Sequence, residues 1–351
     1  MVQLGAYEYD ESKLLGEGSF AKVYLGNRVG NPLEIVAVKV IDISKCDSRF
    51  TDEINILQKL QSEYIVKIFD HVIRAQQQKC YLILEYCDEG TLADVNPKLN
   101  RFQAMRFFLQ IVEGMKVLDK NKIIHRDLKL ENILVHKGVA KITDFGFAKR
   151  MLANQLLVHS VKCGSPATMA PEIYLNNQQY QQYSMKNDIF SLAVILHELF
   201  YKIHPYNYEQ QRLQNRDRVK VSNPHNLVED FIQRALQHNP HLRMGFEQLF
   251  EHELIITFKD FLELDNMGNP VSDDYLLKKL GNQFKNIDPE NHQEMQRKKQ
   301  FWNQLIERDC NNNEVSVKEI QQIGQIQFPN WVGGLLLAIL VGTYIFKHMF
   351  V

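Results

Sequence analysis

The sequence has no excess of charge of either sign and no cysteine pattern that would bind a metal. Its 351 residues include 41 basic and 42 acidic side chains, so no overall positive charge favours nucleic acid as a partner. The five cysteines form no Cys-x-x-Cys pair, which argues against a zinc site. We see no secretory signal, internal repeat or long polar tract, and we expect free thiols in a reducing, cytosolic setting.

The residue types divide the chain into a strand-rich first part and a helix-rich second part. Up to about Leu84, runs of Val, Ile and Tyr between turn residues predict strands, with one amphipathic helix at residues 50–61. Helical periodicity then dominates at residues 101–122, 186–202, 227–236 and 246–254. The sequence therefore predicts an α+β protein with a small β-rich lobe, one key helix within it, and a larger helical lobe.

Two motifs of the first part each have a functional and an ordinary interpretation. Gly16 and Gly18 lie between two strands, where they would let backbone amides approach a phosphate, but a glycine-rich hairpin turn explains them as well. A Rossmann site is excluded, because a strand follows these glycines. Lys39 lies inside an apolar strand, where it either faces solvent or pairs with a carboxylate such as Glu53.

A dense polar cluster interrupts the apolar segment 123–135. Its members are His125, Arg126, Asp127, Lys129, Glu131 and Asn132. Unpaired charge beside buried strands is costly, so the cluster indicates a functional site. Asp144 follows at the end of the next predicted strand, across the turn at residues 136–139. Asn132 and Asp144 would then converge as hard oxygen ligands for Mg²⁺.

The order of these motifs resembles the eukaryotic protein kinase fold. The glycine loop, Lys39, Glu53, His-Arg-Asp-Leu-Lys-x-x-Asn, Asp-Phe-Gly and Ala-Pro-Glu follow one another between Tyr9 and about Ile256. Lys129 and the run CGSP are similar to Ser/Thr kinases rather than tyrosine kinases. The runs GSFAKVYLG, LEYCDEGTLAD, DFGFAKR, CGSPATMAPE and RMGFEQLFEHEL most resemble the autophagy-initiating, unc-51-like kinases, and polo-like and calcium-dependent kinases share parts of them.

The resemblance implies ATP and Mg²⁺ as cofactors and Ser/Thr hydroxyls of proteins as substrates. Asp127 would accept the hydroxyl proton and Lys129 would neutralise charge on the transferring phosphoryl group. Lys39, paired with Glu53, would contact the α/β-phosphates, while Asn132 and Asp144 would hold Mg²⁺. The expected ATP-binding residues are Leu15, Gly16, Glu17, Gly18, Ser19, Phe20, Val23, Ala37, Lys39, Leu84, Glu85, Cys87 and Leu134, with main-chain groups of Glu85 and Cys87 on adenine.

The resemblance also implies boundaries and supporting contacts. The kinase domain would span 9–256, with an N-lobe at 9–84, a hinge at 85–90 and a C-lobe at 91–256. Beyond it, the residues themselves predict a charged helical extension at 257–330 and a hydrophobic tail at 331–351. We call residues 125–132 the catalytic loop and residues 163–172, CGSPATMAPE, the substrate loop. The expected supporting contacts are Ser165 with Asp127 and Lys129, Glu172 with Arg243, Asp188 with the catalytic loop, and His125 with Phe145 and Leu57 in the core.

The activation segment departs from the family pattern. In relatives, the arginine at position 126 binds a phosphorylated Ser/Thr four positions before Ser165, where this chain has Val161. Ser160 is the only hydroxyl between Asp144 and Ser165, so we expect it to carry the phosphate. The alternative is that Arg126 binds backbone or an acidic partner, which would make the enzyme constitutively active.

The tail is the most apolar part of the chain. Residues 331–346, about sixteen positions, contain no charge, and as a helix they would span roughly 24 Å against a hydrocarbon core of ~30 Å. If Lys347 and His348 snorkel and residues 349–351 are included, the length becomes adequate. We expect a membrane anchor that leaves the kinase domain in the cytosol, with docking on the folded protein as the alternative.

An active kinase and a membrane-tethered pseudokinase scaffold are the two classes of function to compare. The set Lys39, Glu53, Asp127, Asn132 and Asp144 is intact, whereas pseudokinases usually lack at least one of these residues. The sequence therefore favours an active kinase.

Overall fold

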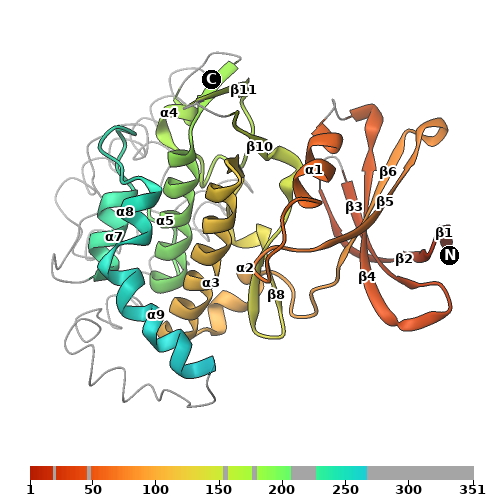
Figure 1. Cartoon of the computed structure of the whole chain (residues 1–351), viewed down its shortest axis with the longest axis horizontal. Helices are drawn as coiled ribbons and strands as arrows, with labels where there is room; N and C mark the ends of the chain where they lie inside the picture. The colour runs from red at the N-terminus through yellow and green to blue at the C-terminus, as the bar shows by residue number, and fades with distance from the viewer. Residues whose placement is uncertain (19–20, 46–48, 153–156, 176–179, 207–226, 267–351) are drawn as a thin grey trace, which may run out of the picture. The chain divides into compact units, whose positions relative to one another are not determined.

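The computed structural model describes residues 1–18, 21–45, 49–152, 157–175, 180–206 and 227–266. All of these residues belong to one compact unit, Met1–Asn286. Within it, a curled antiparallel sheet with α1 beside it forms one lobe, and the long helices α3 and α5 lie in the other (Figure 1). The predicted tail at 331–351, and the predicted extension beyond Asn266, lie outside the described residues.

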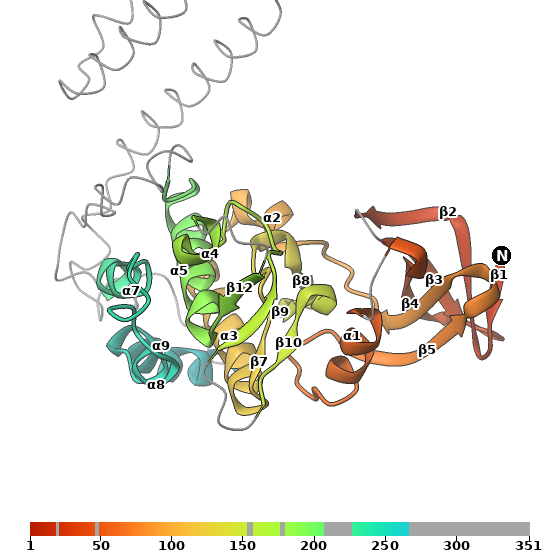
Figure 2. The same ribbon diagram turned by 90° about the horizontal axis from the view of Figure 1, so that it is seen from above.

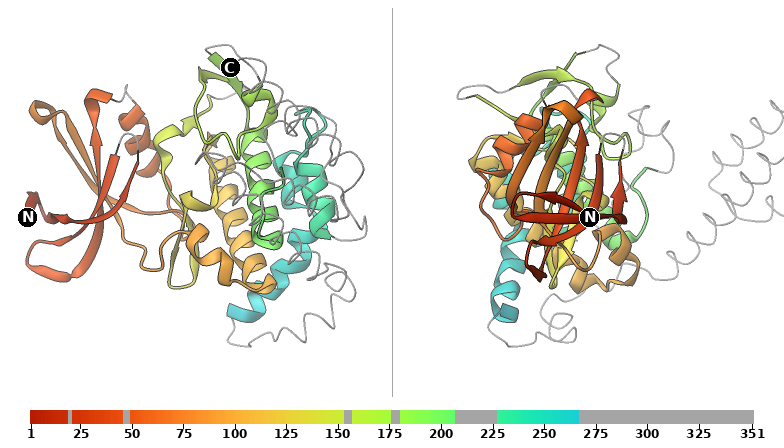
Figure 3. Two further views of the ribbon diagram at one scale, coloured as in Figure 1. Left: turned by 180° about the vertical axis from the view of Figure 1, so that it is seen from behind. Right: turned by 90° about the vertical axis from the view of Figure 1, so that its right-hand side faces the viewer.

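The first lobe is a six-stranded sheet in the order β1-β2-β3-β4-β6-β5. Its strands are β1 (Val2–Leu4), β2 (Tyr7–Glu17), β3 (Ala21–Arg28), β4 (Asn31–Asp42), β5 (Ile68–Arg74) and β6 (Lys79–Glu85), and its helices are η1 (Ile43–Lys45), α1 (Arg49–Leu57) and η2 (Ala75–Gln77). The sheet begins seven residues before the expected boundary at Tyr9, because Leu4 is buried and β1 pairs with β2 from Val2 onward. Figure 3 shows this sheet from two further sides.

The alternation of side chains along β4 determines which of them lie on each face of the sheet. Val36 and Val38 pack into one cluster with Tyr81, whereas Ala37 and Ile41 join the main core on the other face. Lys39 has the same parity as Ala37 and Ile41 and therefore lies on the α1 side of the sheet. The apolar alternation thus fixes the direction of the one lysine in the strand.

The second lobe is mainly helical. Its helices are α2 (Leu92–Val95), η3 (Asn96–Lys98), α3 (Arg101–Lys120), η4 (Leu130–Asn132), η5 (Phe145–Phe147), α4 (Pro171–Tyr174), α5 (Met185–Tyr201), α7 (Leu227–Ala235), α8 (Phe246–Phe250) and α9 (Glu253–Asn266). Its short strands are β7 (Ile123–Ile124), β8 (Ile133–His136), β9 (Val139–Ile142), β10 (Lys149–Arg150), β11 (Val158–Val161) and β12 (Tyr180–Tyr183). Helix α3 begins with a capping box, in which the side chains of Asn100 and Gln103 bond each other's backbone amides.

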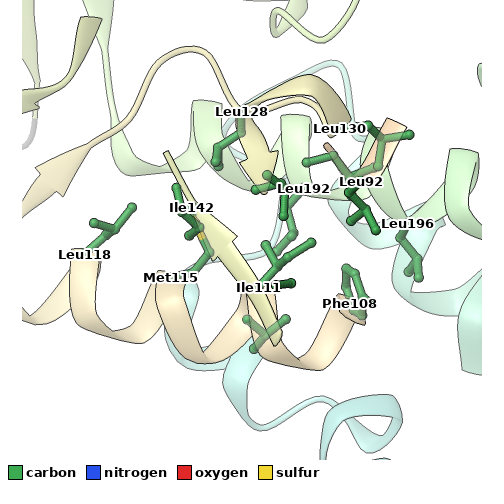
Figure 4. Close-up of a cluster of buried hydrophobic side chains, with 14 of the residues drawn as sticks. Leu92, Phe108, Ile111, Met115, Leu118, Leu128, Leu130, Ile142, Leu192 and Leu196 are labelled. Carbon is green, nitrogen blue, oxygen red and sulfur yellow. The ribbon is translucent and has the colours of Figure 1, made fainter. Parts of the chain in front are cut away.

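The core of this lobe lies between α3, α5 and the β8–β9 hairpin. Figure 4 shows Ile111 and Met115 of α3 beside Ile142 of β9, with Leu192 of α5 near Leu128. All of these side chains are fully buried. In Figure 2, β8, β9 and β10 lie between α1 and the helices α3 and α5. The catalytic loop and the turn at Asp144 are therefore anchored on a packed hydrophobic base.

Backbone hydrogen bonds tie the two lobes together next to the site. The amide of Val66 donates to the carbonyl of Ile142, and the amide of Ile142 donates to the carbonyl of Tyr64. These bonds thus fix the position of β9, and of Asp144 after it, relative to the segment that follows α1.

One helix that the sequence predicted as continuous is two helices in the structure. The segment 246–254 is divided, because α8 ends at Phe250 and α9 begins at Glu253. His252 forms the break, since its Nδ1 accepts the amide of Leu254 at 3.1 Å while its Nε2 lies 3.0 Å from Asp230 Oδ2. Helix α9 then continues to Asn266, past the expected end of the lobe at 256. Within the described ranges, no helix combines the length and apolar character needed to cross a membrane.

Candidate active site

Three charged side chains from three elements meet beside the sheet. Lys39 Nζ of β4 lies 2.7 Å from Glu53 Oε1 of α1 and 2.8 Å from Asp144 Oδ1, which precedes η5. The partners of Lys39 are 14 and 105 residues away in the sequence. Glu53 is only 3% exposed, so its charge depends on this lysine. The structure therefore brings together the ammonium and both of the carboxylates that the sequence singled out.

The electrostatics of this trio follow from burial and pairing. Burial opposes the charged form of Lys39, but Asp144 and Glu53 outweigh it, so the pKa of the lysine is raised. Burial raises the pKa of Glu53, an effect that the ammonium opposes. The Lys39 charge lowers the pKa of Asp144 to about 2, although 42% of that side chain is exposed. Asp144 is thus an anion at neutral pH.

The catalytic loop presents Asp127 in a fixed position. Its Oδ1 accepts the amide of Ser165 at 2.6 Å, and its Oδ2 accepts Asn132 Nδ2 at 2.9 Å. Lys129 Nζ lies 3.3 Å from Asp127 Oδ2 and donates to Ser165 Oγ at 2.6 Å. The expected contact of Ser165 with both groups is present. A carboxylate held by three partners is oriented before any substrate arrives.

Buried polar groups support this loop from behind. Asp188 of α5 accepts the amides of His125 at 2.6 Å and of Arg126 at 2.9 Å, as the sequence predicted. The side chain is fully buried, and that burial raises its pKa. His125 donates from Nε2 to the carbonyl of Thr143 at 2.9 Å, and its ring meets Phe145 edge-on at 4.9 Å between centroids. His125 is therefore a packed structural residue, as expected.

The residues near Asp144 fit a magnesium ion. Asn132 donates its Nδ2 hydrogens to the carbonyl and the carboxylate of Asp127, which leaves the amide oxygen for another partner. Asp144 supplies a second hard oxygen. Mg²⁺ usually takes one or two protein oxygens and completes its octahedron with water and phosphate oxygens. The chemistry of this pair agrees with that preference.

The described residues that are expected to enclose a nucleotide lie on β2, β3, β4, β6 and β8, except that Gly18 follows β2 and Cys87 follows β6. Val23 and Leu134 are partly buried, and Ala37, Leu84 and Cys87 are buried. A Cβ added at Gly16 would meet nothing within 4 Å, so there is open space beside this part of the loop. Leu15 and Glu17 are exposed in the same strand, and Gly18 follows it with its amide donating to Ala21. Ser19 and Phe20 lie outside the described residues.

A backbone hydrogen bond at the end of β6 limits how Glu85 can contact adenine. The amide of Glu85 already donates to the carbonyl of Lys67 at 2.8 Å, so a contact of this residue with adenine is restricted to its carbonyl oxygen. Cys87 is buried, and that burial raises the pKa of its thiol to about 12. The thiol is therefore protonated and unreactive at neutral pH.

The substrate loop is anchored by the expected ion pair. Arg243 donates from both terminal nitrogens to Glu172, at 2.8 Å each, and its side chain is fully buried. This fork geometry makes the pair both strong and directional.

The activation segment gives Ser160 and Arg126 separate surroundings. Ser160 lies on β11 opposite Gln181 of β12, an antiparallel pairing that we did not anticipate. Arg126 donates from Nε to the carbonyl of Phe147 at 2.6 Å, and its guanidinium lies over the ring of Tyr183. A backbone contact of Arg126 is one of the two arrangements that the constitutive alternative allows. The phosphorylation of Ser160 stays a prediction.

Two lysines near the site were missed by sequence reasoning. Lys141 of β9 is buried, donates to the carbonyl of Glu63 at 2.7 Å and lies 3.2 Å from Glu85 Oε1 beside the hinge. A lysine inside an apolar strand, the signal that identified Lys39, would have found it. Lys149 of β10 pairs with Asp52 of α1 at 2.9 Å and ties the activation segment to the helix that carries Glu53. Nothing local in the sequence indicates that pair.

A lobe built on a curled sheet, a helical lobe and these converging charges define the class of protein. The family model that describes the protein kinase domain matches residues 9–255. The chain belongs to the protein kinase family, which confirms the predicted fold class. Protein kinases use ATP and Mg²⁺.

Individual relatives refine this assignment. The serine/threonine-protein kinase TIO of Arabidopsis thaliana is 31% identical over 298 residues, which are 81% of this chain and 22% of that protein. The serine/threonine-protein kinase unc-51 of Caenorhabditis elegans is 31% identical over 73% of this chain and 32% of its own length. The human serine/threonine-protein kinase ULK1 is 32% identical over 72% of this chain and 26% of its own length. The chain thus resembles Ser/Thr kinases, and it spans 22% to 32% of these three relatives.

Proposed function

We propose that this protein is an active kinase that transfers the γ-phosphoryl group of ATP to Ser or Thr hydroxyls of proteins. The observation that carries the proposal is the joint geometry of the two trios, Lys39 with Glu53 and Asp144, and Asp127 with Lys129 and Ser165. Phosphoryl transfer depends mainly on positioning and electrostatic stabilisation, which both trios supply.

Each residue then has a definite task. Asp127 orients the acceptor hydroxyl and takes its proton, and Lys129 stabilises charge on the moving phosphoryl group. Lys39 positions the α/β-phosphates, with Glu53 fixing the direction of the ammonium. When bound, Mg²⁺ would be held by Asn132 and Asp144 and would neutralise phosphate charge.

The rival function is a pseudokinase scaffold, and a transfer assay separates the two. Purified full-length chain is incubated with radiolabelled Mg·ATP and arrays of Ser, Thr and Tyr peptides. We expect label on Ser and Thr peptides, and we expect Asp127→Asn to lower the rate by about 10²–10⁴-fold, the range for a general base. Asp119→Asn, a half-buried carboxylate at the end of α3 that pairs with Lys122, is the matched control and should leave the rate unchanged. Equal rates for wild type and Asp127→Asn would refute the activity.

We also propose a role in initiating autophagy, supported by the resemblance to unc-51-like kinases and by the names of relatives such as ATG1b of Arabidopsis thaliana. The test is complementation of cells that lack their own autophagy-initiating kinase. Wild type should restore starvation-induced autophagy and Asp127→Asn should not. Failure of an active, well-expressed wild type to restore it would favour the polo-like or calcium-dependent alternative.

For the tail we propose insertion of residues 331–351 into a membrane, with the kinase domain on the cytosolic side. The support is the run of about sixteen residues without charge at 331–346. The full chain should stay in the membrane pellet after carbonate extraction, and deletion of 331–351 should release it. A full chain that is entirely in the supernatant would contradict the anchor.

A further inference from the structure

Arg126 is a buried cation whose charge is balanced in an unusual way. The residue is only 9% exposed, yet no carboxylate forms an ion pair with it in the described part of the chain. Its Nε donates to the carbonyl of Phe147, and one terminal nitrogen, Nη1, has no hydrogen-bond partner among the described residues. The face of Tyr183 lies 4.9 Å from the guanidinium carbon. The negative face of an aromatic ring attracts a desolvated guanidinium, so this ring supplies part of the missing counter-charge.

Tyr183 also binds the chain that leads into the substrate loop. Its hydroxyl accepts the amide of Cys163 at 2.9 Å and lies 3.2 Å from the carbonyl of the same residue, to which it donates. Its backbone position pairs with Val158 across the β11–β12 ladder. Burial raises the pKa of the phenol, so the hydroxyl keeps the proton that it donates. The residue is 1% exposed and packs with Val158 and Met169 in a small core.

Between these two contacts, the chain after Cys163 meets the catalytic loop. Cys163 is two residues before Ser165, whose amide binds Asp127. Gly164, between them, has a φ of +101°, and a Cβ there would lie 2.3 Å from the carbonyl oxygen of Arg126. The substrate loop therefore rests directly on the backbone of the catalytic loop. A group that contacts Arg126 on one side and Cys163 on the other therefore links the two loops next to the bond between Ser165 and Asp127.

We propose that Tyr183 is the positioning residue that joins the catalytic loop to the substrate loop, and that it makes the activity independent of a phosphate on the activation segment. The inference rests on the proposed kinase function. In this proposal, the ring of Tyr183 holds Arg126 in place and its hydroxyl holds Cys163, whereas in the Ser160 hypothesis a phosphoserine holds Arg126. Each arrangement would hold Arg126, but only the tyrosine is built into the fold.

The first test removes phosphate. Full-length protein is treated with a phosphatase, its mass is checked, and kcat/KM for a peptide substrate and Kd for ATP are measured. We expect the phosphate-free wild type and Ser160→Ala each to keep kcat/KM within about twofold of the untreated enzyme, because the tyrosine contact is unchanged. A loss of tenfold or more in either, with ATP affinity unchanged, would show that phosphate does the positioning and would overturn the proposal.

The second test changes the tyrosine. Tyr183→Leu removes both the ring face and the hydroxyl, and we expect a loss of about thirtyfold in peptide kcat/KM, with Kd for ATP within twofold. Tyr183→Phe keeps the ring and loses the Cys163 bonds, so a loss of about threefold to tenfold is expected. The control is Tyr201→Leu on α5. The hydroxyl of Tyr201 also forms a hydrogen bond, to Glu229, but it lies outside the loop contacts, so peptide kcat/KM should be unchanged. An unchanged rate in Tyr183→Phe and Tyr183→Leu would refute the role.

A double-mutant cycle distinguishes positioning from general packing. If Tyr183 acts through Arg126, the losses in kcat/KM of Arg126→Met and Tyr183→Leu are strongly non-additive, whereas independent packing defects add. Should Tyr183→Leu fail to fold, the cycle is run with Tyr183→Phe, and additive losses then overturn the proposal. Failure of the kinase function itself has a different signature, because wild type would bind ATP and label no Ser or Thr peptide.

Discussion

The nucleotide side and the substrate side of the site hold their buried cations by opposite means. On the nucleotide side, Lys39 is held by two carboxylates from α1 and from the turn after β9. On the substrate side, Arg126 is held by a carbonyl and an aromatic ring. The first arrangement depends on charges from three elements being in place together, whereas the second depends on the packing of neutral groups.

The contrast shows that the two halves of the site differ in how strongly they depend on charged partners. A network of buried charges is strong when complete and unfavourable when one member is missing. An arginine over a ring has no ion pair to lose, so its contact with Tyr183 depends on packing within its own lobe. We infer that the nucleotide side assembles only when α1 is in place, whereas the substrate side is assembled by the fold of its lobe.

Loss of Lys39 should break the nucleotide side most severely. Lys39→Met leaves Glu53 buried without its cation and removes a group that faces the phosphates, so we expect kcat/KM to fall by about 10²–10³-fold. The measurement is steady-state transfer to a peptide, with Lys59→Met, an exposed lysine after α1, as the control. A decrease of less than tenfold would mean that the charge network is not the support of the nucleotide side.

The anchor of the substrate loop should dominate stability. Arg243→Met leaves Glu172 without its buried fork, and breaking such a pair destabilises a protein by about 3–5 kcal/mol. The free energy of unfolding is measured by denaturant titration. Arg234→Met, whose side chain is 63% exposed on the same lobe, should change it by less than about 1 kcal/mol. Equal effects of the two variants would contradict the assignment.

The contact between the two loops can be tested with a matched pair of glycines. Gly164→Ala puts a Cβ against the Arg126 carbonyl at positive φ, so we expect peptide kcat/KM to fall about tenfold through strain and displacement, with ATP affinity unchanged. Gly138→Ala has the same sign of φ but meets nothing within 4 Å, and it should leave the kinetics unchanged. If both variants behave alike, backbone strain alone is the cause.

The smallest effect concerns pH. Because the pKa of Asp144 is lowered to about 2, its contribution to stability is fully present above the ordinary value of 3.8 and is lost only as the pH falls towards 2. The difference in Tm between wild type and Asp144→Asn should therefore be constant from about pH 5 to 8 and should shrink below about pH 4. A difference that changes between pH 6 and 7 would show that Asp144 is not held by Lys39.

The outcome for particular residues shows which kinds of contact a sequence reveals. The pairs Lys39–Glu53, Asp188 with the catalytic loop, and Glu172–Arg243 were expected, because each belongs to a motif with a known order. Tyr183 was not expected, because it lies 57 positions after Arg126 and its hydroxyl bonds to backbone, which no residue pattern marks. The β11–β12 pairing was missed for the same reason.

Sequence alone determined the class of protein, the order of the charged groups and, through the alternation of β4, the face on which Lys39 lies. Those properties are local, because periodicity and short motifs act over a few residues. The tertiary structure alone decided that Arg126 lies over a tyrosine ring and that Gly164 rests on its carbonyl. Such contacts join segments far apart in the chain, and packing in three dimensions selects them from many partners that the sequence treats as equivalent.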